Sequence, residues 1–193
     1  MEIIIYIFVN KRTKIMLVRL MDVDKKTSTQ CVEEIAENFL DEDKLKTFLD
    51  FYNFLNINKL GKGKTGRKVN GSWAINYKNK KIGHFRFHEN SWSLDYFDLF
   101  QRIKWFEKCE KYLTTELKDF ILANINTTSN CCIKGTCHST ENQVILGEMF
   151  NSRVCACCPI ILANPDGKTL EFAKELVLIG KNIVAEIMES SIN

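Results

Sequence analysis

Two stretches near the start of the chain carry hydrophobic residues at helical spacing. Residues 22–50 are acidic, and the first apolar stripe consists of Val32, Ile35, Ala36, Phe39 and Leu40. The second stripe consists of Leu45, Phe48, Leu49, Tyr52 and Leu55. Asp41 lies between the two stripes, where a carboxylate can cap the second helix. The pattern predicts an αα-hairpin whose apolar face packs on another element.

Three later segments alternate apolar and polar positions instead. WAINY, IGHFRFH and WSLDYF are rich in aromatic residues and follow period 2, which is typical of β-strands. Short polar turns at residues 78–81 and 89–91 separate them. We expect an antiparallel meander of three strands or more. The residues that should share a face within each strand are Trp73 with Ile75 and Tyr77, Phe85 with Phe87, and Trp92 with Leu94 and Tyr96.

Helical patterns return after the strands. Thr114 or Thr115 can cap a helix that begins near Glu116. Asn164 can cap a long C-terminal helix, with Pro165 at its first position. This order of helices, meander and helices predicts an α+β fold with the sheet covered by helices. We expect an N-terminal strand, hairpin or non-native start at residues 1–21 and an α+β domain at residues 22–125. A cysteine-rich zinc segment with a C-terminal helix packed on that domain should occupy residues 126–193.

The apolar run at residues 3–9 is too short to span a bilayer. No cationic region precedes it and no small-residue cleavage site follows it, so it does not resemble a secretory signal. The composition, 45% hydrophobic and 26% charged, is typical of a soluble globular protein. We therefore expect a cytoplasmic protein with no membrane partner. In that compartment clustered cysteines indicate metal or redox chemistry more often than disulfides.

Six of the eight cysteines fall within residues 131–158, in two tight groups. A structural zinc is held by four ligands, usually two from each of two chain segments. The spacing favours a zinc site formed by Cys132 and Cys137 with Cys155 and Cys158. Such a site would hold a loop in place where little core is available.

Other assignments of the cysteines stay open. The alternative ligands are Cys131, Cys157 and His138. A site with two metal ions that share a bridging thiolate would use more of these side chains. An iron–sulfur cluster also takes four thiolates, and an accessible cysteine pair could act in redox chemistry. Cys31 and Cys109 lie on the apolar sides of predicted helices, where a buried thiol is expected.

Positive charge is concentrated in residues 59–88, which contain nine Lys or Arg and no Asp or Glu, whereas the whole chain carries +3. Such a separation attracts phosphate-bearing partners, and interleaved aromatic rings could stack on bases. A sheet with aromatic residues inward and lysines outward is the simpler explanation of the same pattern. The candidate ligand-binding residues are Lys62, Lys64, Arg67, Trp73, Tyr77, His84, Arg86 and His88.

His84, Arg86 and His88 alternate along one predicted strand and therefore share a face. Imidazoles there could serve acid–base chemistry or bind a metal. Glu89 and Asp95 are near in sequence, but the spacing does not direct either carboxylate at a histidine. No known catalytic motif is present, and GKGKTG lacks the strand-before, helix-after context of a phosphate loop. These absences favour a binding protein over an enzyme.

GSWAINYKNKKIGHFRF and the later YLTTELKDFI resemble the uncharacterised bacterial YdhG-like proteins, small α+β domains with a Trp-containing meander and flanking helices. The resemblance covers residues 45–125 and leaves the cysteine segment outside. It implies the fold and no activity.

The sequence predicts a non-enzymatic, zinc-containing protein that binds a small anionic, nucleotide-like ligand at an aromatic and basic sheet face. The alternative is a thiol-based or metal-dependent enzyme or sensor that uses the cysteine cluster. Nucleic-acid binding through residues 59–88 is a third possibility.

Overall fold

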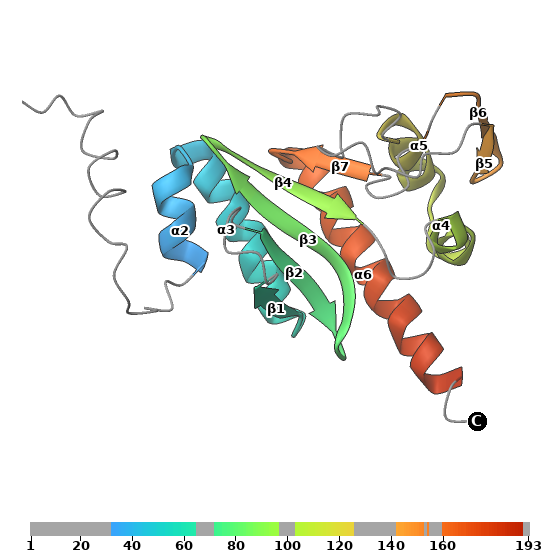
Figure 1. Cartoon of the computed structure of the whole chain (residues 1–193), viewed down its shortest axis with the longest axis horizontal. Coiled ribbons are helices and arrows are strands. Elements are labelled where there is room, and N and C mark those ends of the chain that lie inside the picture. The colour runs from blue at the N-terminus through green and yellow to red at the C-terminus, as the bar shows by residue number, and fades with distance from the viewer. Residues whose placement is uncertain are drawn as a thin grey trace, which may run out of the picture. The chain divides into compact units, whose positions relative to one another are not determined.

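The computed structural model describes residues 32–64, 72–96, 103–125, 142–152, 154 and 160–190 (Figure 1). The chain divides into two units, Met1–Cys31 and Val32–Asn193, and every described residue belongs to the second. Of residues 62–64, 96, 103–105 and 143 only the backbone is described. The predicted strand or hairpin at residues 1–21 lies outside the described residues.

The predicted αα-hairpin is confirmed. Helix α2 spans Val32–Phe39 and helix α3 spans Glu42–Ile57. Asp41 caps α3, because its side chain accepts a hydrogen bond from the backbone N–H of Lys44 at 3.0 Å. The backbone N–H of Asp41 also donates to Asn90 Oδ1 at 3.1 Å, which ties the start of α3 to a turn of the sheet.

The predicted meander is also confirmed, and it is part of a larger sheet. The five strands are β1 (Gly61–Lys64), β2 (Ser72–Tyr77), β3 (Lys80–His88), β4 (Ser91–Tyr96) and β7 (Ile160–Ala163). They lie in the order β1-β2-β3-β4-β7, and each neighbouring pair is antiparallel. Because β7 comes from the C-terminal third of the chain, the sheet joins the two segments that the sequence predicted separately.

One face of this sheet forms the core. Trp73 lies opposite Phe85 and stacks on it with ring centroids 5.5 Å apart. Phe48 of α3 is completely buried and meets three rings of the sheet, with the ring of Phe87 nearest at 4.7 Å. Helices α2 and α3 therefore cover the aromatic face. In Figure 1, α3 lies behind the strands and α2 lies to their left.

The remaining elements follow β4 in the chain. They are α4 (Ile103–Cys109), the 3₁₀ helix η1 (Glu110–Tyr112), α5 (Thr115–Ala123), β5 (Gln143–Ile145), β6 (Glu148–Phe150) and α6 (Gly167–Ser190). Thr114 caps α5 as predicted, because its side chain accepts a hydrogen bond from the backbone N–H of Leu117. No helix within the described residues is long and apolar enough to cross a membrane.

Helix α6 packs beside α3 on the same side of the sheet and also contacts β3 and α4. Lys174 of α6 pairs with Asp50 of α3 at 2.9 Å, and Lys181 donates to the backbone oxygen of Asn58 at 3.2 Å. The buried residues of α6 run from Leu170 to Val184. The three helices α2, α3 and α6 thus leave the other face of the sheet to its polar side chains.

Candidate functional site

The side chains that point away from the aromatic core form what we call the polar face of the sheet. Strand residues alternate between faces, and residues paired across antiparallel strands share a face. The strand register therefore assigns ten residues to the polar face: Ser72, Ala74, His84, Arg86, His88, Ser91, Ser93, Asp95, Ile161 and Ala163.

Three ionisable side chains meet at the centre of this face. His84 and Asp95 lie directly opposite each other on β3 and β4, and His84 Nε2 is 2.7 Å from Asp95 Oδ2. Arg86 Nη2 lies 2.7 Å from the same oxygen. Arg86 Nε and Nη2 also lie 2.9 and 2.5 Å from His84 Nε2. Depending on the tautomer, His84 Nε2 donates to the carboxylate or accepts from the guanidinium.

Burial differs sharply among the three groups. The side chain of Asp95 is 2% exposed and that of His84 is 9% exposed, whereas that of Arg86 is 35% exposed. Burial lowers the pKa of His84 from its usual value, and the neighbouring Asp95 opposes that shift. The cluster at neutral pH is therefore a neutral imidazole, a buried carboxylate and a guanidinium that reaches the surface.

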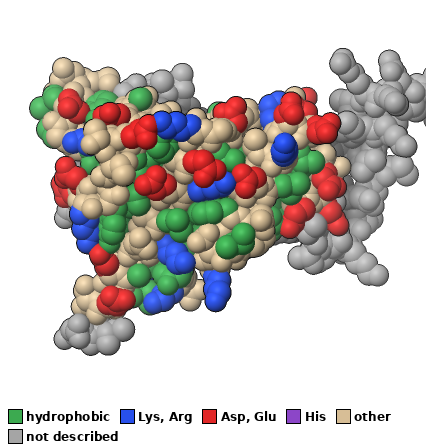
Figure 2. Space-filling view, turned by 180° about the vertical axis from the view of Figure 1, so that it is seen from behind, with side chains coloured by type: hydrophobic (Ala, Val, Ile, Leu, Met, Phe, Trp, Pro, Cys, Tyr) green, Lys and Arg blue, Asp and Glu red, His purple; other side chains and the backbone are tan. Residues whose placement is uncertain are grey.

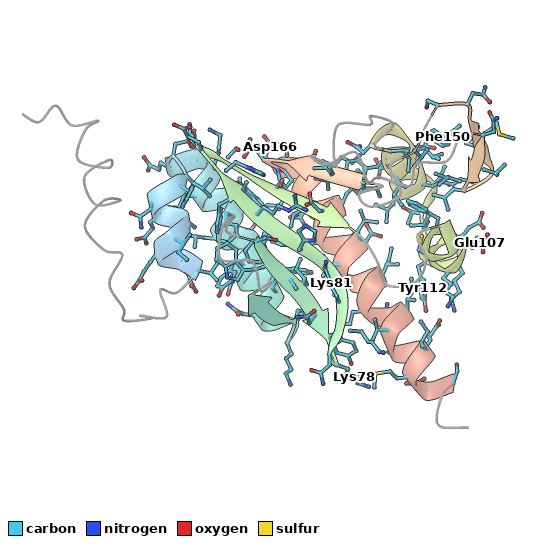
Figure 3. All side chains as sticks on the ribbon, viewed as in Figure 1. Lys78, Lys81, Glu107, Tyr112, Phe150 and Asp166 are labelled. Carbon is cyan, nitrogen blue, oxygen red and sulfur yellow. The ribbon has the colours of Figure 1, made fainter. Side chains whose placement is uncertain are left out.

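Positive charge lies beside this cluster. Lys81, labelled in Figure 3, extends from β3 between the β2–β3 turn and His84. Its ammonium group is close enough to lower the pKa of His84 further. With Arg86 and Lys81 positive, Asp95 negative and His84 neutral, these four groups sum to +1. The surface around the cluster therefore favours an anion.

A second polar pair extends the face toward the β3–β4 turn. His88 is exposed, and its Nε2 lies 3.5 Å from the hydroxyl of Ser93, at the limit of a hydrogen bond. Ser93 lies directly opposite Arg86 in the register. Ser93 is buried, so exposed His88 is the member of this pair that can contact a molecule bound at Arg86.

The sheet does not bring all the predicted ligand-binding residues together. Trp73 is 4% exposed and lies in the core, on the face opposite His84 and Arg86. Tyr77 is half-buried, and the ammonium groups of Lys78 and Lys181 lie 5.5 and 5.4 Å from its ring centroid. The side chains of Lys62 and Lys64, and the whole of Arg67, lie outside what the structure describes.

The sequence analysis missed Asp95 as the partner of His84, although a signal for it was present. A two-residue turn at residues 89–90 pairs His88 with Ser91, and the same register places His84 opposite Asp95. The longer turn expected at residues 89–91 gave no such register. A difference of one residue in the length of the turn therefore decides whether Asp95 is predicted to lie opposite His84.

The predicted metal ligands cannot be located on this fold. The primary set Cys132, Cys137, Cys155 and Cys158, and the alternates Cys131, Cys157 and His138, lie outside the described residues, as does Cys31. Cys109 is completely buried as predicted, and burial raises the pKa of its thiol to about 12. Within the described ranges no group of three or more His, Cys, Asp or Glu side chains could hold a metal ion.

No family model, curated protein or solved structure matches this chain. The resemblance to the YdhG-like proteins therefore stays a prediction. What the chain does has to be argued from the polar face and the sequence.

Proposed function

We propose that this is a non-enzymatic binding protein that takes a small anionic ligand at Arg86 on the polar face of the sheet. The observation that carries this proposal is a buried carboxylate that fixes a partly exposed guanidinium. Asp95 is 2% exposed and holds Arg86 Nη2 at 2.7 Å. Burying a charged group has a large desolvation cost, so a buried cluster of this kind is a candidate functional site.

The chemistry of Arg86 suits phosphate or carboxylate. A guanidinium presents a planar fork of N–H donors that matches either anion in two contacts. Asp95 restricts the side chain before a ligand arrives, which lowers the entropy lost on binding. Exposed His88 lies two residues along the same strand face and can add a contact to a phosphate group, whereas Ser93 beside it is buried. A nucleotide-like ligand fits this donor set, with its phosphates on Arg86.

Acid–base catalysis is less well supported than binding. A general base needs a ring nitrogen within reach of the proton that it removes. His84 Nε2 is already engaged with Asp95 and Arg86, and its Nδ1 is buried. The imidazole therefore supports the position of its neighbours rather than facing a substrate.

Ligand-induced stabilisation tests the proposal. Pyrophosphate, ADP and ATP should raise the melting temperature of the wild-type protein, and Arg86→Met should abolish the increase. Because Arg86→Met leaves a carboxylate buried without its partner, the double variant Arg86→Met/Asp95→Asn should be measured as well. Lys46→Met on the exposed side of α3 is the charge-matched control. An unchanged increase in the double variant, or no increase in the wild type, would refute anion binding at Arg86.

We also propose that a structural zinc bound by Cys132, Cys137, Cys155 and Cys158 stiffens this scaffold. The hairpin β5–β6 supports the idea, because it pairs Gln143 with Phe150, and the two cysteine-bearing segments precede and follow this hairpin in the chain. Cys137 lies five residues before Asn142, and Cys155 lies four residues after Asn151. At about 3.5 Å per residue both lie within reach of the hairpin base.

Elemental analysis and thiol alkylation test the zinc site. Protein purified without chelator or metal resin should contain about one zinc per chain. The clustered cysteines should resist iodoacetamide until a chelator is added, whereas buried Cys109 should stay unmodified in the folded protein throughout. Bound iron, or clustered thiols that react before chelation, would favour the iron–sulfur or redox alternative.

A further inference from the structure

A second surface, separate from Arg86, gathers lysines at one end of the sheet. We call it the basic tip, and its described members are Lys59, Lys78, Lys80 and Lys181. They come from the turn after α3, the β2–β3 turn, the start of β3 and α6. The ring of Tyr77 contacts the ammonium groups of Lys78 and Lys181, and Lys181 also donates to the backbone oxygen of Asn58, next to Lys59. Figure 2 shows Lys and Arg side chains gathered along the lower edge of the helix-covered side.

The lysines of the basic tip lack carboxylate partners, unlike four lysines elsewhere in the described structure. Lys44, Lys111, Lys168 and Lys174 each form an ion pair with Asp or Glu. Among the described residues, no carboxylate pairs with any of the four lysines of the basic tip. Residues 59–88 contain no Asp or Glu at all, so the sequence places no acidic side chain beside the two turns. The positive charge of the tip is therefore available to an outside partner.

Two of these lysines also occupy backbone positions that disfavour lysine. Lys59 has φ +56° directly after α3, where the hydrogen bonds from Lys59 N to Asn56 O and from Leu60 N to Leu55 O close a Schellman motif. Glycine is the usual residue at that position. Lys78 has φ +45° and begins a two-residue hairpin turn, where asparagine or glycine is preferred. Both turns therefore carry lysine at a positive φ, where the backbone favours glycine or asparagine.

We propose that the basic tip binds the phosphodiester backbone of single-stranded nucleic acid. Lysine ammonium groups contact phosphates as point charges without reading bases, so binding should be tolerant of sequence. A nucleic-acid strand carries one phosphate per nucleotide. Successive phosphates can therefore contact lysines that lie on three neighbouring segments of the protein. Membrane-binding surfaces combine lysines with exposed apolar side chains. Among the large hydrophobic side chains described as exposed, Ile57 alone lies next to the tip.

The test uses the full-length protein, its Lys59→Asn/Lys78→Asn variant and a fluorescein-labelled 20-nucleotide DNA or RNA of mixed sequence. Asparagine adopts positive φ readily, so this variant should melt at the same temperature as the wild type or higher. Each lost single-strand contact reduces the salt slope by about 0.7, so two lost contacts should weaken binding about 25-fold at about 0.1 M salt. The control variant Lys46→Gln/Lys168→Gln removes the same charge elsewhere and should weaken binding less than about twofold.

Three outcomes would overturn the proposal. The first is no binding of the oligonucleotide at low salt. The second is equal weakening in the control variant, which would indicate attraction to net charge alone. The third is tighter binding to phosphatidylserine vesicles than to the oligonucleotide at matched phosphate concentration, which would indicate a membrane surface. The Lys59→Asn/Lys78→Asn variant should keep the increase in melting temperature that pyrophosphate gives the wild-type protein, so this test is independent of the proposed small-ligand site.

Discussion

Replacing Asp95 with asparagine tests most directly whether the polar cluster holds Arg86 in place. The substitution keeps the shape of the side chain and removes its charge. In the native protein this carboxylate is 2% exposed and lies 2.7 Å from both His84 Nε2 and Arg86 Nη2. After the substitution the guanidinium loses its counter-charge on a largely dehydrated face of the sheet. The variant should therefore be less stable.

The expected loss can be estimated from the burial of the two partners. Breaking a fully buried ion pair from one side costs roughly 3–5 kcal/mol. About a third of the Arg86 side chain is exposed, so water compensates for part of the lost interaction. We expect Asp95→Asn to lower the free energy of unfolding by about 2–3 kcal/mol. Removing both charges in Arg86→Met/Asp95→Asn should recover most of that loss, because no unpaired buried charge remains.

Urea denaturation at neutral pH, followed by tryptophan fluorescence, measures these differences. Asp119→Asn makes the same chemical change at an exposed position of α5 and should change stability by less than about 0.5 kcal/mol. The unfolding slope should stay constant across the series. If Asp95→Asn costs no more than the control, or if the losses in the double variant simply add, the two charges are not coupled. The cluster would then not position Arg86.

Two further predictions concern pH and helix capping. Burial lowers the pKa of His84 below the ordinary value of 6.5 for an imidazole, so the unfolded chain takes up a proton at a higher pH than the folded chain does. This contribution to the free energy of unfolding is complete above pH 6.5 and declines as the pH falls below that value. His84→Gln should therefore reduce the pH dependence of the free energy of unfolding measured between pH 7 and 5. Thr114→Ala removes the acceptor for Leu117 N and should lower the free energy of unfolding by about 1 kcal/mol, measured by thermal or urea unfolding. Thr114→Ser keeps a hydroxyl and should cost much less. Equal losses in the two variants would contradict the capping role.

The aromatic pattern predicted the core of the sheet correctly because it follows directly from strand geometry. Side chains alternate between faces, and the large rings of Phe85, Phe87 and Trp92 fall on one face. Helical stripes on residues 32–57 supplied the helices that cover them. Both signals are local, so neither required knowledge of which segments meet.

Two strands escaped prediction for different physical reasons. β1 has the sequence GKGK, which carries no apolar residue and lies at the edge of the sheet, so its pairing with β2 leaves no local pattern. β7 is a short apolar run whose pairing with β4 depends on chain segments about 65 residues apart. Asn164 was predicted to cap α6. Instead its side chain accepts a hydrogen bond from Trp92 N at 2.8 Å, which anchors β7 to β4, and α6 begins at Gly167.

The division of the sheet into two faces restricts where a ligand can bind. The sequence predicted aromatic and basic residues at a single ligand surface, but strand alternation places Trp73 and Phe85 on one face and His84 and Arg86 on the other. The helices bury the aromatic face, so a base could stack on those rings only if the helices moved away. Within the described part of the sheet, we therefore expect a ligand to bind at the polar face or the basic tip. Since Arg86 and Lys59 lie on different elements, single substitutions at each can separate a small-ligand role from a nucleic-acid role in one protein.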